Sequence, residues 1–507
     1  CSKRLQLAQI KKQGLLNLLI NYIGFGIGGM NYILLMPLYF ATYEIGLIRL
    51  LISLANVWVS LARLGTHVTF VRFFEQHRTA DRRHGGFVHW MYGLAAAGML
   101  LLTLVYLGFQ GFIYGYFVQK SALFADDYYY TLIPFALLML VFSMLESQAS
   151  AIQRTVLSNF LREVALRLVF LLAIILFASQ WLNLRAVVWL QILAYGGVSV
   201  WLGWDLHRSG QFSWKGSACE LPSAQRSELT RFSLLMMLTA GAQQLIQNLD
   251  SMMLGAMAGL EDVGVYGVYL SIALLVALPE RSLMRILFPV ANEALLTGNW
   301  PRVSELYKKS ALIQLCAGLW ILGGIWINEP VLYHFLKAEA YRTNFGVFIL
   351  LGMNYLINMG FGMNSYIILG TRYYRIETLL NVILLLLTVL LNYLLIQSYG
   401  AVGAAGATFI SITLINVARW AYIRWRFNLS PFSWRNPLVA SWGSLLIILF
   451  TQAPHHPSWH IDLAIRSLFF TALYFSLILA LKVAPDLNQT ALQIWSRMLQ
   501  VTKNRPK

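Results

Sequence analysis

The sequence LIQNLDSMMLGAMAGLEDVGVYGVYL, residues 245–270, contains the features on which the predicted fold depends. It places one acidic side chain, Asp250, in an apolar run of membrane-span length. After a short turn at residues 260–262 the chain becomes apolar again and carries Gly264 and Gly267. Because a carboxylate at membrane depth is costly, Asp250 indicates a lined cavity.

The turn and the apolar segment after it have an earlier counterpart in the chain. A shift of 218 positions lays residues 44–65 over residues 262–283. Four positions are then identical: Gly46 with Gly264, Ser53 with Ser271, Ala55 with Ala273, and Arg63 with Arg281. The alignment predicts an internal duplication of the chain.

The composition excludes a soluble globular protein. Of the 507 residues 58% are hydrophobic and 12% are charged, and the mean hydropathy is +0.62. One core could not bury so much apolar surface. Apolar runs of about 18 to 25 residues recur along the chain and do not alternate as barrel strands would, so helices span the bilayer.

The basic charge does not indicate nucleic-acid binding. The formal net charge is +17, but Lys and Arg lie in short loops between apolar runs, and no nucleic-acid partner is expected. Three cysteines without CxxC spacing predict neither a disulfide framework nor a zinc site. The chain has no P-loop and no metal-ligand cluster, and its loops are too short for a nucleotide-sugar site. We therefore expect no enzyme activity, no cofactor and no metal.

We predict an all-α integral membrane protein with about fourteen transmembrane helices. Lys and Arg collect in alternate connections, which predicts that both termini are cytoplasmic. The predicted spans are residues 14–39, 46–65, 87–109, 130–148, 160–177, 187–204, 232–257, 263–285, 310–327, 345–369, 379–396, 402–421, 438–451 and 463–481.

The repeat predicts the organisation of these helices. Span eight repeats span two, so each unit contains six helices and the two units have the same orientation. We expect two pseudo-symmetric bundles that enclose a central cavity. The predicted parts are an N-terminal lobe at 1–206, a cytoplasmic linker at 207–229, a C-terminal lobe at 230–426, and a hairpin with a cytoplasmic tail at 427–507.

Several segments carry a family resemblance: NLDSMMLG at 248–255, GVYGVYLSI at 264–272, ALPERSLMRILFPV at 277–290 and GAVGAAGATFIS at 400–411. With them the chain resembles the multidrug/oligosaccharidyl-lipid/polysaccharide (MOP) exporter superfamily, in particular its O-antigen and exopolysaccharide flippases. The resemblance implies a transporter of the bacterial inner membrane that moves an undecaprenyl-pyrophosphate-linked oligosaccharide outward by alternating access. It also implies membrane lipids, a coupling ion (H⁺ or Na⁺) and polysaccharide assembly proteins as partners.

Two charged residues at similar depth are the first site candidates. Asp250 in span seven and Arg49 in span two should each face a cavity or a partner, because exposure to hydrocarbon costs about 2.5 to 3.5 kcal/mol. They form either a salt bridge that closes the lobes or a site for substrate or a coupling ion.

Further arginines and amides are candidates for the substrate. Arg63 and Arg281 lie near the inner ends of equivalent spans, where a guanidinium suits a pyrophosphate but also commonly snorkels to lipid headgroups. Amides at membrane depth suit sugar hydroxyls, although hydrogen bonds between helices explain them equally well. The predicted amides are Asn31, Gln247, Asn354 and Asn358.

Two local expectations follow from the residue types. Glu146 should pair with Arg154, Arg162 or Arg167 rather than carry a proton. Glycines in span one and Pro279 in span eight should permit bends.

Three other functions remain open. A flippase for the peptidoglycan precursor lipid II shares the fourteen spans, whereas a drug/cation antiporter of the multidrug (MATE-like) branch usually has twelve. A membrane polysaccharide polymerase or glycosyltransferase would need a substantial outer loop, and the loops here are short.

Overall fold

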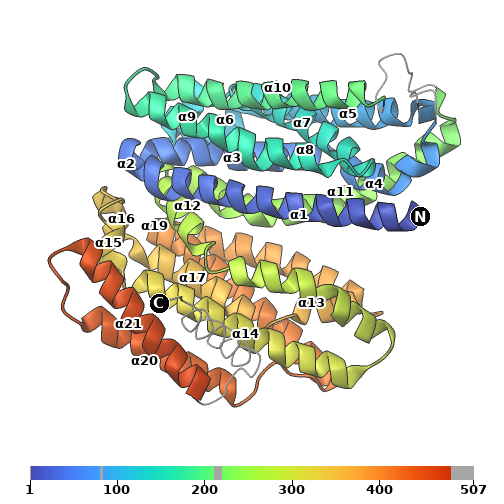
Figure 1. Cartoon of the computed structure of the whole chain (residues 1–507). Helices are drawn as coiled ribbons and strands as arrows, with labels where there is room; N and C mark the ends of the chain where they lie inside the picture. Colours follow the sequence, from blue (N-terminus) through green and yellow to red (C-terminus); the bar gives the residue numbers. More distant parts are fainter. Residues whose placement is uncertain (1, 80–83, 211–219, 481–507) are drawn as a thin grey trace, which may run out of the picture. The chain divides into compact units, whose positions relative to one another are not determined.

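The computed structural model describes residues 2–79, 84–210 and 220–480, and these ranges contain helices and no strand. Parts of the predicted linker (211–219) and tail (481–507) lie outside the described residues. The helices up to the linker are α1 (Ser2–Gly29), η1 (Met30–Leu35), α2 (Met36–Tyr39), α3 (Thr42–Ala62), α4 (Thr66–His77), η2 (His84–Gly86), α5 (Phe87–Gly108), α6 (Gln110–Val118), η3 (Phe124–Tyr128), α7 (Leu132–Ala151), α8 (Thr155–Phe160), η4 (Leu161–Ala165), α9 (Leu166–Ala178) and α10 (Leu184–Arg208) (Figure 1).

The remaining helices follow the linker. They are α11 (Ser223–Met257), α12 (Leu260–Ala273), α13 (Leu278–Leu296), α14 (Trp300–Trp326), α15 (Glu329–Leu332), α16 (Glu339–Thr343), α17 (Phe345–Gly360), α18 (Asn364–Leu369), α19 (Tyr374–Phe427), α20 (Arg435–Gln452) and α21 (Trp459–Ala480). The predicted all-α fold class is confirmed.

The predicted spans fall within these helices. Among the described residues, eight helices are long and apolar enough to cross a membrane, or nine if the bent pair α12 and α13 is one span. The 54-residue α19 contains two predicted spans and is interrupted at Gly400, where φ is +50°. The count of fourteen crossings stays a prediction.

The surfaces of the helices are those of a multi-pass membrane protein. Large apolar side chains remain exposed in the middle of long helices, for example Leu100 (62% exposed), Val200 (74%) and Leu468 (69%). In water such surfaces would promote association, whereas lipid chains solvate them.

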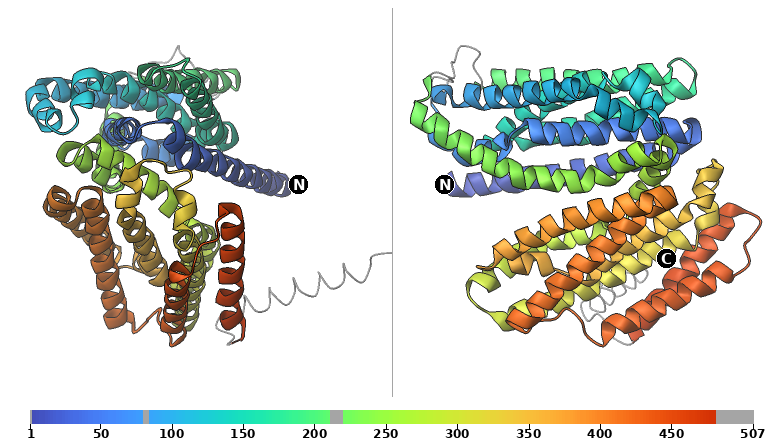
Figure 2. Two further views of the ribbon diagram at one scale, coloured as in Figure 1. Left: turned by 90° about the vertical axis from the view of Figure 1, so that its left-hand side faces the viewer. Right: turned by 180° about the vertical axis from the view of Figure 1, so that it is seen from behind.

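The chain contacts divide the protein into two compact units (Figures 1 and 2). Unit 1 contains residues 1–268, 338–340 and 392–404, and unit 2 contains residues 269–337, 341–391 and 405–507. Unit 1 therefore includes α11, which the sequence repeat assigns to the second lobe. The predicted lobe boundaries and the central cavity stay predictions.

The predicted bend is present in the eighth span, whereas the first span contains a π-helical segment and its bend stays a prediction. The first span changes from α-helix to π-helix at Met30–Leu35. The eighth span breaks between α12 and α13 with a bend of 52°, and Pro279 lies in the first turn of α13. Such interruptions leave backbone groups outside the regular helix ladder and are frequent at functional sites.

Glycines bring α3 and α12 into backbone contact in unit 1. A Cβ on Gly46 would overlap the carbonyl oxygen of Leu260, and a Cβ on Gly264 would overlap the carbonyl oxygen of Thr42. The 218-residue shift relates Thr42 to Leu260 and Gly46 to Gly264. Each glycine therefore faces the carbonyl of the residue that is equivalent, in the other repeat, to the one its partner faces. Such a reciprocal contact is expected at a two-fold axis between the repeats.

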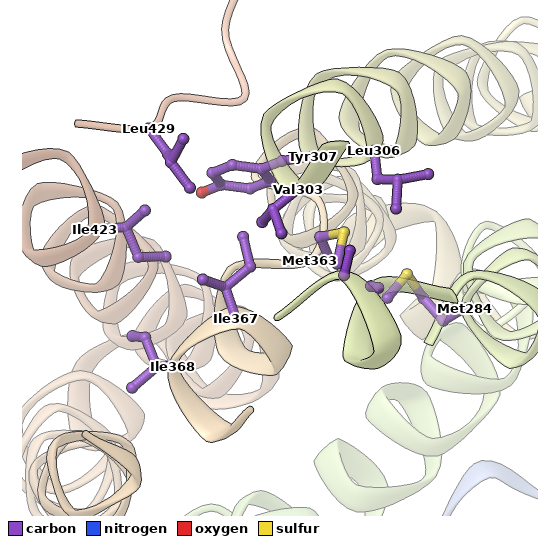
Figure 3. Packing of buried hydrophobic residues seen from close by; sticks show 11 residues of the cluster. Met284, Val303, Leu306, Tyr307, Met363, Ile367, Ile368, Ile423 and Leu429 are labelled. Atoms are coloured by element: carbon purple, nitrogen blue, oxygen red, sulfur yellow. The ribbon is translucent and has the colours of Figure 1, made fainter. Parts of the chain in front are cut away.

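One core of unit 2 joins α13, α14, α18 and the second half of α19 (Figure 3). Tyr307, Met363 and Ile367 are fully buried there. The members of this cluster, called here the unit 2 end core, include Met284, Val303, Leu306, Tyr307, Met363, Ile367, Ile368, Ile423 and Leu429.

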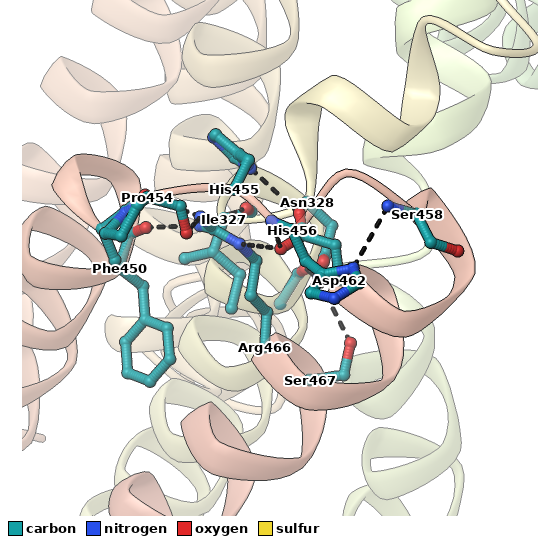
Figure 4. Close-up of polar contacts among 12 residues, drawn as sticks. Ile327, Asn328, Phe450, Pro454, His455, His456, Ser458, Asp462, Arg466 and Ser467 are labelled. Atoms are coloured by element: carbon teal, nitrogen blue, oxygen red, sulfur yellow. Dashed lines mark hydrogen bonds and ion pairs between the residues drawn. The ribbon is translucent and has the colours of Figure 1, made fainter.

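The appended helices α20 and α21 pack along α14. Arg466 of α21 is 4% exposed and donates to the carbonyls of Phe450, Ala453 and Pro454 at 2.5 to 2.9 Å (Figure 4). It therefore caps the C-terminal end of α20, whose last carbonyls have no partner within the helix. Asp462 accepts from Arg466 at 3.0 Å and neutralises it.

Candidate functional site

Asp250 lies in a buried polar cluster of unit 1. Its side chain is 9% exposed on α11. Oδ1 accepts from Nδ2 of Asn392 at 2.7 Å, and Oδ2 accepts from the hydroxyl of Tyr266 on α12. The amide oxygen of Asn392 is buried and has no hydrogen-bond partner among the described residues. We call Asp250, Tyr266 and Asn392 the Asp250 cluster.

The Asp250 cluster has the chemistry of a cation or proton site. It gathers carboxylate, phenol and amide oxygens, which are the hard ligands that alkali and alkaline-earth cations use. The unpartnered amide oxygen adds a free acceptor where an unsatisfied polar atom is costly. Sequence reasoning did not identify Tyr266 or Asn392, because both bonds form only when separate helices pack, and Asn392 is 142 positions from Asp250.

Arg49 packs against Gly267, the residue that follows Tyr266 of this cluster. Its Cγ is 3.2 Å from the position that a Cβ on Gly267 would take, so the missing side chain leaves room for the guanidinium stem. Its Nε is buried and has no hydrogen-bond partner in the described part of the chain. The two donors named for Asp250 are neutral, and a pairing of Arg49 with Asp250 stays a prediction.

The other predicted residues of unit 1 are differently placed. Arg63, the C-cap of α3, donates to Oγ of Ser143 at 2.9 Å, and its Nε is buried without a partner among the described residues. Asn31 is fully buried and donates to the carbonyl of Arg167 at 2.9 Å. Gln247 is exposed.

A cavity of about 240 Å³ lies within unit 1 between the first, second, fifth and sixth spans. Its polar lining comes from Tyr32, Arg162, Glu163, Arg167, Gln191 and Tyr195. Arg162 pairs with Glu146, as predicted, and Arg167 pairs with Glu163 at 2.6 Å. Arg49 lies within electrostatic range of Tyr32 on the cavity wall. The cavity is polar and wide enough for several waters or a small polar group.

The predicted residues of unit 2 divide into a buried group and an exposed one. Asn358 donates to Glu280 at 2.8 Å and accepts from Asn416 at 3.3 Å. Asn354 is 5% exposed, and its Oδ1 has no partner in the described ranges. Arg281 is exposed. Asn354 is thus buried and Asn358 is partly buried, whereas the side chain of Arg281 lies on the surface of unit 2.

A buried ion pair of unit 2 was missed by the sequence reasoning. Glu377 is 1% exposed and accepts from Nε and Nη2 of Arg419 at 3.0 and 2.6 Å. Ser365 also donates to Glu377 at 2.7 Å. Glu377 falls two residues outside the predicted span, and the single arginine within span twelve was the available signal.

Comparison with known proteins was made for sequence and for structure. No family model and no curated protein matches the sequence. A structure of the lipid II flippase MurJ in an inward closed conformation matches 92% of this chain and 98% of its own, with a TM-score of 0.70 and 12% identity. The chain has the fold of MOP-superfamily transporters.

Multidrug members of the MOP superfamily match over less of the chain. An inward-facing MATE family transporter covers 81% of this chain and 94% of its own, with a TM-score of 0.57 and 15% identity. An outward-facing MATE family transporter covers 82% and 96%, with a TM-score of 0.51 and 13% identity. The MOP fold is therefore matched in structures of both conformational classes.

Proposed function

We propose that this protein is a flippase that moves an undecaprenyl-pyrophosphate-linked oligosaccharide outward across the bacterial inner membrane, for polysaccharide or O-antigen synthesis. The observation that favours a lipid-linked substrate over a drug is the extent of the fold match. The MurJ match leaves 8% of this chain uncovered, which is less than residues 427–507 occupy, so part of the appended hairpin is matched. The two MATE family transporter structures leave 18 to 19% of this chain uncovered.

The Asp250 cluster supplies the coupling step in this proposal. Binding of H⁺ or Na⁺ at Asp250 would change the charge of a carboxylate that is buried in unit 1. A ligand shifts a conformational equilibrium only by its differential affinity for the two states. A carboxylate held by Tyr266 and Asn392 in one state is suited to such a difference.

The arginines of unit 1 are the proposed contacts for the phosphate part of the substrate. Arg49 and Arg63 each have a buried Nε without an acceptor among the described residues. A permanently charged guanidinium with free donors is suited to a pyrophosphate, because it makes paired charge-assisted hydrogen bonds. The predicted amides and Arg281 remain proposed contacts of the same substrate.

Flipping of lipid II is the second candidate function, and the match to MurJ is the observation that favours it. Deletion of the gene, followed by extraction and mass spectrometry of lipid-linked intermediates, separates the candidates. Accumulated undecaprenyl-linked oligosaccharide supports the first proposal, and accumulated lipid II supports the second. Unchanged intermediates together with increased drug sensitivity would replace both with an antiporter.

A further inference from the structure

Two arginines converge on one tyrosine where the two ends of α19 meet. Nη2 of Arg372 donates to the hydroxyl of Tyr373 at 2.7 Å. Nε and Nη2 of Arg426 donate to the same oxygen at 2.8 and 2.6 Å. We call these three residues the Arg–Tyr cluster. Both guanidinium groups therefore donate hydrogen bonds to the same neutral hydroxyl oxygen.

The positive charge of the Arg–Tyr cluster is not neutralised by the described residues. Neither arginine forms an ion pair in these ranges, and the nearby carboxylate of Glu377 is bonded to Arg419. Hydrogen bonds from Arg372 and Arg426 lower the pKa of the Tyr373 hydroxyl, which reports the local positive field. Two like charges held this close repel each other, and an anion between them would remove the repulsion.

Packing holds the cluster in place. The ring of Tyr373 lies 5.9 Å from that of Phe427 and 6.1 Å from that of Tyr422. Phe427 stacks on Trp300 at 4.9 Å. Tyr422 and Phe427 in turn pack against the unit 2 end core, which Figure 3 shows. The guanidinium groups are thus anchored through Tyr373 to a buried cluster rather than carried on a loose loop.

The surroundings are those of a membrane interface. Trp425 is 80% exposed and Trp434 is 64% exposed, and Arg435 lies over the Trp434 ring. Further exposed arginines, Arg375 and Arg424, flank the cluster in the sequence. Exposed tryptophans at the ends of apolar helices mark the level of lipid headgroups. Basic side chains at that level bind acidic lipids.

We propose that Arg372, Tyr373 and Arg426 bind the phosphate of an anionic membrane phospholipid. The two guanidinium forks match the phosphate oxygens, and the Tyr373 hydroxyl orients both forks in advance. The flanking tryptophans favour a lipid-borne phosphate over a free one, because they place the site at the bilayer surface. The site is independent of the transported substrate.

The test is native mass spectrometry of the full-length protein, which counts phosphatidylglycerol retained from mixed micelles. We expect the double variant R372Q/R426Q to bind phosphatidylglycerol about 30-fold more weakly, from about 1 kcal/mol for each arginine and 1.4 kcal/mol for each factor of ten. The matched control is R78Q/R302Q, which also removes two exposed arginines, each paired with a glutamate. The control should retain the lipid as the wild type does.

A second pair of variants separates geometry from charge. R372K/R426K keeps the positive charge but removes the planar guanidinium groups with their paired donors. Y373F removes the hydroxyl oxygen that both arginines share. Both variants should bind phosphatidylglycerol with intermediate affinity. Thermal unfolding of each variant shows that it is folded. Equal retention by R372Q/R426Q and the wild type overturns the proposal, as does equal retention of phosphatidylcholine. Displacement of the lipid by inorganic phosphate as readily as by phosphatidylglycerol would also overturn it.

Discussion

Gly46 and Gly264 lie against each other in unit 1, and each faces the backbone carbonyl of the helix that carries the other. The 218-residue shift exchanges the two glycines and also exchanges the two carbonyl residues, Thr42 and Leu260. A contact that stays the same when the two repeats are exchanged is expected where the repeats meet on their symmetry axis. This contact supports the duplication proposed from sequence.

The first prediction concerns this contact. G46A and G264A should each lower stability by about 1 to 3 kcal/mol, because the added Cβ meets a backbone carbonyl rather than a flexible side chain. Thermal unfolding in detergent measures the effect. G26A is the control, since nothing lies within 4 Å of its Cβ position and alanine favours the helix. Equal stability of all three variants would show that α3 and α12 do not pack this closely.

The second prediction concerns Asp250. D250N preserves the shape of the side chain and removes its charge, so the protein should insert and fold while flipping falls by at least about tenfold, as expected for a lost coupling free energy of about 1.4 kcal/mol or more. Accumulation of lipid-linked intermediates measures flipping. D126N, at an exposed aspartate that accepts from Tyr114 at 2.6 Å, is the control. Normal flipping by D250N would remove the carboxylate from the coupling step.

The third prediction concerns the Glu377–Arg419 pair. R419M leaves a carboxylate buried without its charge partner and should destabilise unit 2 by about 3 to 5 kcal/mol. E377L/R419M removes both charges and should recover most of that loss. The exposed pair Arg302–Glu305 is the comparison, where R302Q should cost less than about 1 kcal/mol. If R419M and R302Q behave alike, Glu377 is not sealed from water.

The fourth prediction concerns the hairpin of α20 and α21. R466M removes the donors to three carbonyls at the end of α20 and should open the connection at residues 453–458 to protease (Figure 4). The digestion rate at that connection is the measurement. H455A is the control, because His455 is partly exposed and its hydrogen bond to Asp462 leaves the three carbonyl contacts of Arg466 in place. Resistance of R466M to cleavage would assign the stability of the hairpin to apolar packing alone.

Sequence reasoning reached the parts of this fold that depend on local composition. Apolar runs located the helices, and Pro279 located the bend of the eighth span. Glu146 forms an ion pair with Arg162, one of the three arginines predicted as its partner. Each of these depends on residue type and short spacing, which a single sequence contains.

The partners of the buried charges could not be predicted in the same way. Asn392 is 142 positions from Asp250, and Arg419 is 42 positions from Glu377. Such pairs form only after helices pack, and many similar amides along the chain compete for the same assignment. Glu377 was also placed outside its span, because hydropathy alone does not locate a helix end.

The reciprocal glycine contact also limits how the two halves of the gene can diverge. Elsewhere each copy is free to change without the other, and only a few identities between residues 44–65 and 262–283 survive. At Gly46 and Gly264 a side chain gained by either copy collides with the main chain of its sister. Glycine is therefore the residue that both positions require, whatever the rest of each copy has become.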